Sequence, residues 1–176
     1  MTIEENLCTE IFQDLLNKRC IVSSQIIEEK DTCRYFCVKP PKTIVYHPDM
    51  KGIHRNSIIF CLLHEEKHNR HPVRTVVFFL FIAVFLIFLM SMYHISFLLL
   101  FAIIPILGVI LIRREEYECD EFAAISIKNE LNIEEQPSEI IKRTLEIMPY
   151  NWLSAITHPS RQNRIKKIAE RFDKKP

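Results

Sequence analysis

Apolar residues near the start of the chain recur at helical spacing. They are Ile3, Leu7, Ile11, Leu15 and Leu16, with acidic residues between them, and they predict an amphipathic helix over residues 3–17 that packs on the rest of the protein. Between residues 19 and 48 the pattern changes to short runs rich in β-branched and aromatic residues. Two of these runs, 33–38 and 43–46, flank a turn that contains two prolines. They predict a β-hairpin.

The next apolar run, residues 58–63, leads into the polar residues 64–71 and predicts a helix that Asn56 or Ser57 can cap. Pro72 ends or kinks this helix. Further helices are expected directly after residue 113, from Ser138 to about Met148, and in a basic final segment that reaches Phe172.

Residues 75–112 contain no Asp, Glu, Lys or Arg. A single helix of this length would extend about 57 Å, nearly twice the hydrocarbon thickness of a bilayer. Two membrane crossings fit better, over residues 76–92 and 97–112 with a turn at 93–96. We therefore expect a transmembrane helical hairpin at 75–112 between two polar regions, 1–74 and 113–176.

Positive charge marks one end of this hairpin only. Arg70, Arg74, Arg113 and Arg114 flank it, and no charged residue lies at the turn. The positive-inside rule then predicts a two-pass protein of the cell membrane with both termini and both polar regions in the cytoplasm.

Overall composition adds two limits. The 176 residues carry a formal net charge of only +1, and basic residues do not alternate with aromatic ones, so a nucleic-acid partner is not expected. The six cysteines are expected to be reduced and mostly buried, because the N-terminus has acids where a signal peptide needs basic and then apolar residues.

The helix predicted before the hairpin ends in the pattern HExxH, formed by His64, Glu65 and His68. One helical turn separates the two histidines, so both imidazoles project from one face, as two ligands of a single metal ion must. Glu65 lies about 100° round the helix, where a base that activates a metal-bound water belongs. This pattern predicts a zinc site.

An antiparallel hairpin returns the chain to the side where it entered. The helix that follows the hairpin must therefore emerge beside the HExxH helix, and it carries Glu116 and Asp120 four residues apart on one face. A carboxylate from this helix can complete the metal site.

These motifs together resemble a known family. HExxH at 64–68, the hairpin, Glu116-Tyr117 with Asp120 and then Phe122-Ala123-Ala124, and His158-Pro159 with Arg164-Ile165 are similar, in that order, to the membrane metallopeptidases HtpX and the CaaX prenyl protease. The resemblance covers about residues 43–172. With one hairpin only, the chain looks like a reduced member: a small cytosolic catalytic domain with a membrane anchor.

The resemblance implies a gluzincin with an assigned site. Zn2+ would be bound by His64, His68 and Glu116, with Glu65 as the catalytic base. Asp120 would orient a histidine ligand. His158 and Arg164 would lie at the active site and steady the substrate or the oxyanion.

The expected fold is a mainly helical, zincin-like α+β membrane protein, with a small β-sheet and with the transmembrane hairpin inserted between the zinc-binding helices. The expected function is that of an integral-membrane zinc metalloendopeptidase, which hydrolyses peptide bonds through a zinc-activated water on the cytoplasmic side. Its partners would be the lipid bilayer and a peptide or protein substrate, bound as an added strand along an exposed Thr43–Tyr46 edge. Two alternatives remain: an inactive zinc-containing membrane receptor that binds peptides, and a hairpin-anchored scaffold without metal.

Overall fold

The computed structural model describes residues 7–30, 35–39, 42–48, 53–71, 73–90, 95–148 and 152–173. The fold is mainly helical with one small sheet, as expected. In chain order the elements are α1 (Leu7–Asn17), β1 (Gln25–Glu28), β2 (Phe36–Lys39), β3 (Thr43–Tyr46), α2 (Arg55–Arg70), α3 (Val73–Met90), α4 (Ile95–Ile125), the π-helical turn η1 (Ser126–Glu130), α5 (Pro137–Ile147), α6 (Trp152–Thr157) and α7 (Arg161–Phe172).

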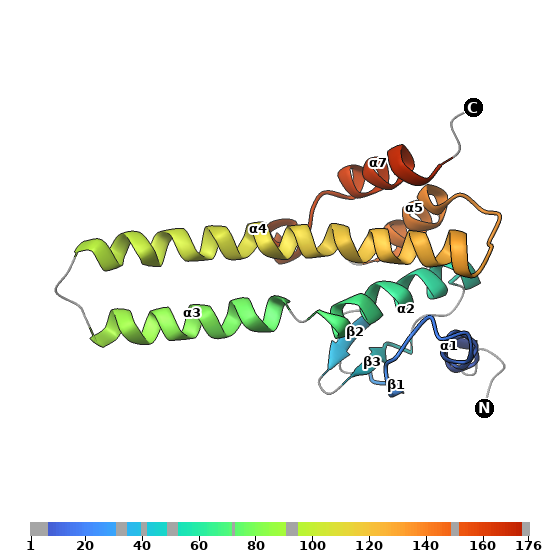
Figure 1. The fold of residues 1–176 in the computed structure, drawn as a ribbon, viewed down its shortest axis with the longest axis horizontal. Helices are drawn as coiled ribbons and strands as arrows, with labels where there is room; N and C mark the ends of the chain where they lie inside the picture. Colours follow the sequence, from blue (N-terminus) through green and yellow to red (C-terminus); the bar gives the residue numbers. More distant parts are fainter. Residues whose placement is uncertain are drawn as a thin grey trace.

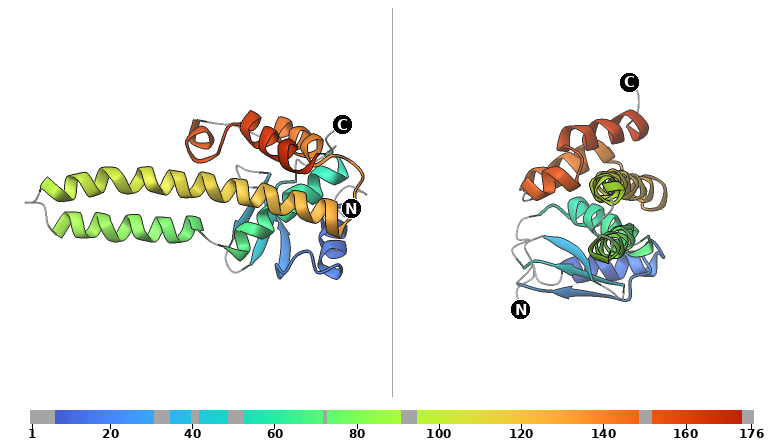
Figure 2. Two further views of the ribbon diagram at one scale, coloured as in Figure 1. Left: turned by 45° about the horizontal axis from the view of Figure 1, so that its top comes forward. Right: turned by 90° about the vertical axis from the view of Figure 1, so that its left-hand side faces the viewer.

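Helix α2 lies at the centre of the polar part of the molecule. The sheet and α1 pack on one side of it and α4 on the other, while α7 packs on α4 and α5 contacts both α2 and α7 (Figure 1, Figure 2). Apolar side chains of α2 are buried on all faces, including Phe60, Leu62 and Leu63. A helix that is apolar all round must be enclosed by other elements. The HExxH motif therefore lies on a helix that other elements enclose, which fixes its position in the protein.

The sheet has three strands in the order β1-β3-β2. β2 and β3 form the predicted hairpin and pair antiparallel, with Cys37 opposite Val45, whereas β1 pairs parallel to β3. Strand β3, Thr43–Tyr46, is therefore the central strand and is buried along its whole length. The prediction of an exposed Thr43–Tyr46 edge was wrong, because the separate run at 25–28 occupies the side that was expected to be open. The edges of the described sheet are β1 and β2.

The start of α2 differs in detail from the prediction. Its N-cap is His54, whose Nδ1 accepts a hydrogen bond of 3.3 Å from the backbone N–H of Asn56. An imidazole nitrogen takes the place of the usual hydroxyl or carboxylate acceptor. The helix ends at Arg70, just before Pro72, as expected.

One buried acid ties α2 to the segment that leads into β1. Glu66 is fully buried and accepts hydrogen bonds from the backbone N–H groups of Val22 (2.9 Å) and Ser23 (3.1 Å) and from Arg70 Nε (2.9 Å). Arg70 also donates to the carbonyl of Cys20 at 2.9 Å. These bonds satisfy a carboxylate that would otherwise be costly to bury.

Helices α3 and α4 form an antiparallel hairpin that projects from the rest of the molecule (Figure 1). They approach closely at Gly108, where a Cβ would lie only 2.9 Å from Val77 Cγ1. The turn predicted at residues 93–96 falls partly outside the described residues. Within the described ranges, no helix combines the length and the apolar character that a membrane crossing requires. The hairpin is thus present, but the prediction of two transmembrane helices is not supported.

Helix α4 is one continuous element of 31 residues, from the hairpin to Ile125. The sequence suggested two helices here, one up to residue 112 and another after it. Both belong to one helix, which carries the hairpin's return arm and also Glu115, Glu116, Cys119 and Asp120. Of the five cysteines in the described part of the chain, four are buried.

Candidate metal centre

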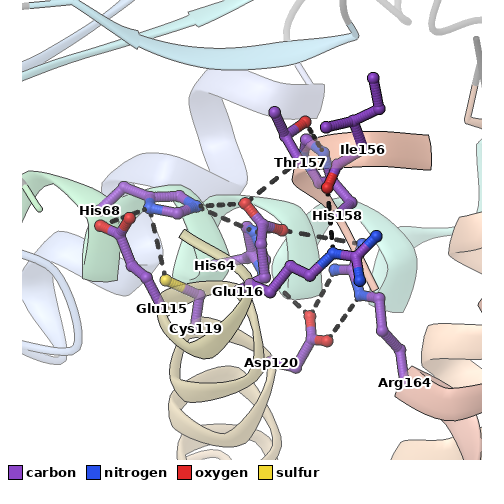
Figure 3. A network of polar contacts seen from close by, with 11 residues as sticks. His64, His68, Glu115, Glu116, Cys119, Asp120, Ile156, Thr157, His158 and Arg164 are labelled. Atoms are coloured by element: carbon purple, nitrogen blue, oxygen red, sulfur yellow. Dashed lines mark hydrogen bonds and ion pairs between the residues drawn. The ribbon is translucent and has the colours of Figure 1, made fainter. Parts of the chain in front are cut away.

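Two imidazole nitrogens face each other on the buried side of α2. Nε2 of His64 and Nε2 of His68 are 3.3 Å apart, and both side chains are about nine-tenths buried. The four-residue spacing places the rings on one face of the helix, one turn apart. Figure 3 shows both rings directed toward α4.

Helix α4 places a carboxylate against this pair of nitrogens. Glu116 Oε2 lies 3.5 Å from His64 Nε2, and Glu116 Oε1 lies 3.4 Å from His68 Nε2. The Glu116 side chain is buried. The antiparallel return of α4 along α2 therefore brings together the three residues predicted as metal ligands (Figure 3).

The distances within this trio match those expected around a small divalent ion. Zinc binds histidine nitrogen and carboxylate oxygen at about 2.0–2.2 Å, usually with tetrahedral geometry. The edge of such a tetrahedron is about 3.3–3.5 Å long. The two Nε2 atoms are 3.3 Å apart, and a different Glu116 oxygen lies 3.4 or 3.5 Å from each of them, so the two nitrogens and this carboxylate are a donor set whose chemistry and spacing suit the ion.

Each histidine is held by a second carboxylate at its other ring nitrogen. Asp120 Oδ1 lies 3.0 Å from His64 Nδ1, and Glu115 Oε1 lies 3.1 Å from His68 Nδ1. A carboxylate can only accept, so the shared hydrogen lies on Nδ1 and the lone pair of Nε2 faces the centre. This is the tautomer that a metal ligand needs.

Cys119 forms a second grouping with the same histidines. The ligand atoms of His64, His68 and Cys119 all lie within 4.8 Å of one another, and Cys119 Sγ is 3.5 Å from His68 Nδ1. Nδ1 and Nε2 lie on different sides of the imidazole ring. An ion shared by the two Nε2 atoms therefore has Glu116 within reach, whereas the thiol lies beside the nitrogen that already faces Glu115.

Arg164 on α7 makes a fork-shaped contact with Asp120. Its Nε donates to Asp120 Oδ2 at 2.7 Å and its Nη2 to Oδ1 at 2.6 Å, and Nη1 lies 3.8 Å from Glu116 Oε2. Burial alone would raise the pKa of Asp120, but the charge and hydrogen bonds of Arg164, with the hydrogen bond from His64, lower it from 3.8 to about 2. Asp120 in turn raises the pKa of the buried Arg164. Asp120 is thus held ionised behind His64.

His158 approaches the centre from the segment between α6 and α7. Its Nε2 lies 3.4 Å from Glu116 Oε1, and its Nδ1 lies 2.9 Å from the hydroxyl of Thr157. Thr157 and His158 lie beside Glu116 in Figure 3. Glu65 follows His64 on α2 and is partly exposed. The structure thus brings His158 and Arg164 next to Glu116, with Arg164 directed at the acids on α4.

Sequence reasoning did not single out Glu115 or Thr157. Glu115 directly precedes Glu116. It accepts a hydrogen bond from His68, whereas Asp120 accepts one from His64. One signal in the sequence could have indicated Glu115. Each of two histidine ligands needs an acceptor for its other ring nitrogen, and Asp120 can serve only one of them. Thr157 had no such signal, because its contact with His158 depends on the local backbone at the end of α6.

The fold and this centre define a class. An HExxH helix faces an antiparallel helix that supplies the third donor, which is the arrangement of a metal-dependent peptidase. Residues 13–172 match the family model described as peptidase family M48, and the chain belongs to this metallopeptidase family. Searches of curated proteins and of solved structures found no significant match.

Proposed function

We propose that the protein is a zinc metalloendopeptidase whose ion is bound by His64, His68 and Glu116. The observation that supports this most is the close approach of the two Nε2 atoms, 3.3 Å apart, to the Glu116 carboxylate, which places one oxygen 3.4 or 3.5 Å from each of them, with each imidazole backed by a second carboxylate. Membership of a metallopeptidase family agrees with this chemistry. Asp120 and Glu115 orient the ligands, and Arg164 acts through Asp120 as a positioning residue.

The reaction would be hydrolysis of a peptide bond. Zinc, when bound, supplies a Lewis acid that polarises the scissile carbonyl and lowers the pKa of the attacking water. Glu65 takes the proton from that water and passes it to the nitrogen of the leaving amine. His158, with Nε2 directed at the centre, donates a hydrogen bond to the oxygen on which negative charge develops.

Zinc content and hydrolysis measured together test this proposal. We expect the purified full chain in detergent to hold one zinc ion and to cleave an unfolded protein, to lose cleavage on chelation, and to regain it with zinc. Glu116→Gln should bind zinc 10- to 100-fold more weakly or not at all, since a neutral amide replaces the anionic donor. Cys119→Ala, one turn along the same helix, should keep zinc.

The opposite pattern would contradict the ligand assignment: zinc retained in Glu116→Gln and lost in Cys119→Ala would move the ion to the thiol side of His68. Peptide binding without hydrolysis by the zinc-loaded wild-type chain would point to a receptor instead of an enzyme.

We further propose that the peptide substrate adds as a strand to the outer edge of β2. β2 packs against α2, as Figure 1 shows, and is an edge of the described sheet. The backbone N–H of His47 donates to the carbonyl of Tyr35 at 2.9 Å. Because hydrogen-bonded pairs alternate along an antiparallel ladder, the N–H and C=O groups of Phe36 and Val38 are directed away from β3. They are available to pair with an extended substrate backbone.

Val38→Pro should raise KM for peptide hydrolysis by roughly tenfold, because proline removes one outward N–H and is tolerated where that N–H is not part of the ladder. Val38→Ala is the matched control: it shortens the same side chain and keeps the amide. Michaelis–Menten measurements on both variants decide the point. Equal KM values for the two variants would exclude pairing at this edge.

We also propose that the α3–α4 hairpin lies in a lipid bilayer, with its two flanking regions in the cytoplasm. Large apolar side chains of both helices are exposed between residues 76 and 87 and between residues 103 and 111, and Arg113 and Arg114 follow at the polar end of the hairpin. Such a surface is unfavourable in water. The exposed residues are Val76, Phe78, Phe79, Leu80, Phe81, Phe85 and Ile87 on α3 and Ile103, Ile106, Leu107, Ile110 and Leu111 on α4.

Vesicle flotation tests the hairpin. The full chain should float with phosphatidylcholine vesicles, and the double variant Phe79→Asp/Ile106→Asp should bind at least about tenfold less, because each aspartate in the hydrocarbon layer costs about 3 kcal/mol. Lys166→Asp, at an exposed position on α7, is the control for added negative charge. For orientation, protease added outside sealed inverted membrane vesicles should digest both polar regions. If the double aspartate variant floats as the wild type does, the hairpin is not the lipid contact.

A further inference from the structure

We propose that Arg113 is a positioning residue that holds the segment carrying His158 against the metal centre. The inference rests on the proposed function, since it concerns how His158 reaches its place there. Arg113 is exposed on α4, and both hydrogen bonds of its guanidinium go to backbone carbonyls of α6.

Arg113 binds the end of α6 with two hydrogen bonds. Its Nε donates to the carbonyl of Ile156 at 3.0 Å, and its Nη2 donates to the carbonyl of Ala155 at 2.9 Å. α6 ends at Thr157, so these carbonyls belong to the last turn of the helix, where no further helical N–H is available to them. A guanidinium suits this position because two of its N–H groups point in one direction and its charge opposes the partial negative charge of a helix C-terminus.

The position of Arg113 on α4 shows what this contact aligns. Arg113, Glu116 and Asp120 are at i, i+3 and i+7, which places them on one face of the helix. Their partners follow in the same order along the C-terminal segment: the carbonyls of residues 155 and 156, then His158, then Arg164. Three successive turns of α4 thus hold three successive points of this segment.

Of the two contacts that flank His158, the one made by Arg113 is nearer to it in the chain. Only Thr157 separates Ile156 from His158, whereas the Asp120–Arg164 contact lies six residues further on, inside α7. Without Arg113 the segment would lose the two hydrogen bonds that join the end of α6 to α4. His158 Nε2 would then spend less time 3.4 Å from Glu116 Oε1, and a misplacement of about 1 Å at a reacting centre can lower the rate by about 100-fold.

The next residue offers a matched control. Arg114 has the same charge, lies on the same helix and is also exposed, but its Nε pairs with Glu118 one turn along α4 at 3.0 Å. Removing Arg114 therefore costs the same charge near the hairpin and leaves α6 untouched. Comparing Arg113→Ala with Arg114→Ala separates the hydrogen bonds to α6 from any general effect of charge.

Kinetics on the zinc-loaded full chain give the first test. Arg113→Ala should lower kcat roughly 10- to 100-fold with little change in KM or zinc content, and Arg114→Ala should resemble wild type. Arg113→Lys should recover part of the loss, because an ammonium can reach one carbonyl but lacks the fork. In a His158→Ala background Arg113→Ala should have no further effect, since both changes remove the same interaction.

Hydrogen exchange gives a second test that needs no activity. Amides of residues 152–160 should exchange faster in Arg113→Ala than in wild type, and Arg114→Ala should leave them unchanged. Equal exchange in the two variants, a further rate loss in the His158→Ala background, or zinc lost on Arg113→Ala would each overturn the inference. If the wild-type chain hydrolyses nothing, the proposed function fails, and the exchange comparison still shows whether Arg113 holds this segment.

Discussion

Replacing Glu65 by glutamine should lower the rate of peptide hydrolysis by about 10²- to 10⁴-fold and leave the zinc in place. Glutamine has nearly the same shape but cannot accept the proton of the attacking water. The three proposed ligands come from other positions, so their geometry is unchanged. Zinc content by elemental analysis and single-turnover cleavage of an unfolded protein substrate would measure the two effects separately.

The neighbouring acid provides the comparison. Glu66→Gln is the same chemical change one residue later, but Glu66 is buried against Val22, Ser23 and Arg70. We expect it to lower the free energy of unfolding by about 1–3 kcal/mol while the folded fraction keeps its activity. Zinc-loaded Glu65→Gln protein that cleaves at the wild-type rate would remove Glu65 from the mechanism.

Asp120→Asn should have the largest effect on stability. The substitution removes the carboxylate that accepts two hydrogen bonds from buried Arg164 and leaves only Glu116, 3.8 Å from Nη1, as an acid beside it; breaking a buried ion pair in this way costs about 3–5 kcal/mol. It also weakens the acceptor that holds His64 Nδ1, so zinc affinity should fall about 10- to 100-fold. Chemical denaturation of the zinc-free chain and zinc titration would measure these changes.

An ion pair with one solvent-exposed partner, between the same two helices, serves as the control. Glu121, next to Asp120 on α4, pairs with Arg171 on α7, and the Arg171 side chain is 59% exposed. Glu121→Gln should cost less than Asp120→Asn, since the Arg171 guanidinium that loses its partner is in contact with solvent, whereas Arg164 is buried. If both substitutions destabilise the protein equally, the buried pair has no special part in holding α7 on α4.

The same ion pair predicts how stability depends on pH. Because the pKa of Asp120 is lowered from 3.8 to about 2 in the folded protein, its contribution is complete above pH 4 and is lost as the pH falls from about 4 toward 2. The contribution amounts to roughly 2 kcal/mol. Denaturation of wild type and of Asp120→Asn over this range should therefore give unfolding free energies that converge as the pH falls.

Local pattern predicted the elements well. The strands at the proline-bearing turn, the HExxH helix that stops before Pro72, and the final helix that begins after His158-Pro159 all follow from residue types within one or two turns. The alignment of His64 with His68 needed only the helical period. The uncharged segment predicted that the chain doubles back and brings Glu116 toward these histidines, which the structure bears out in its geometry.

Contacts between distant segments could not be predicted in this way. The parallel pairing of β1 with β3 joins residues 18 positions apart and turned the expected edge strand into the centre of the sheet. Arg164 was expected to face the substrate, yet the packing of α7 on α4 directs it at Asp120. Glu115, Glu116 and Asp120 share one short stretch, and only the rotation of α4 against α2 decides which ring nitrogen each one faces.

The sequence by itself determined which residues can bind the metal and that the chain doubles back between them. The helical period and the uncharged stretch 75–112 carry this information, and both can be read directly from the order of the residues. The tertiary structure alone decided which carboxylate meets Nε2 and which meets Nδ1, which strand lies at the edge, and what Arg113 and Arg164 hold. These choices depend on how whole helices pack against each other, and packing is set by side chains that lie far apart in the chain.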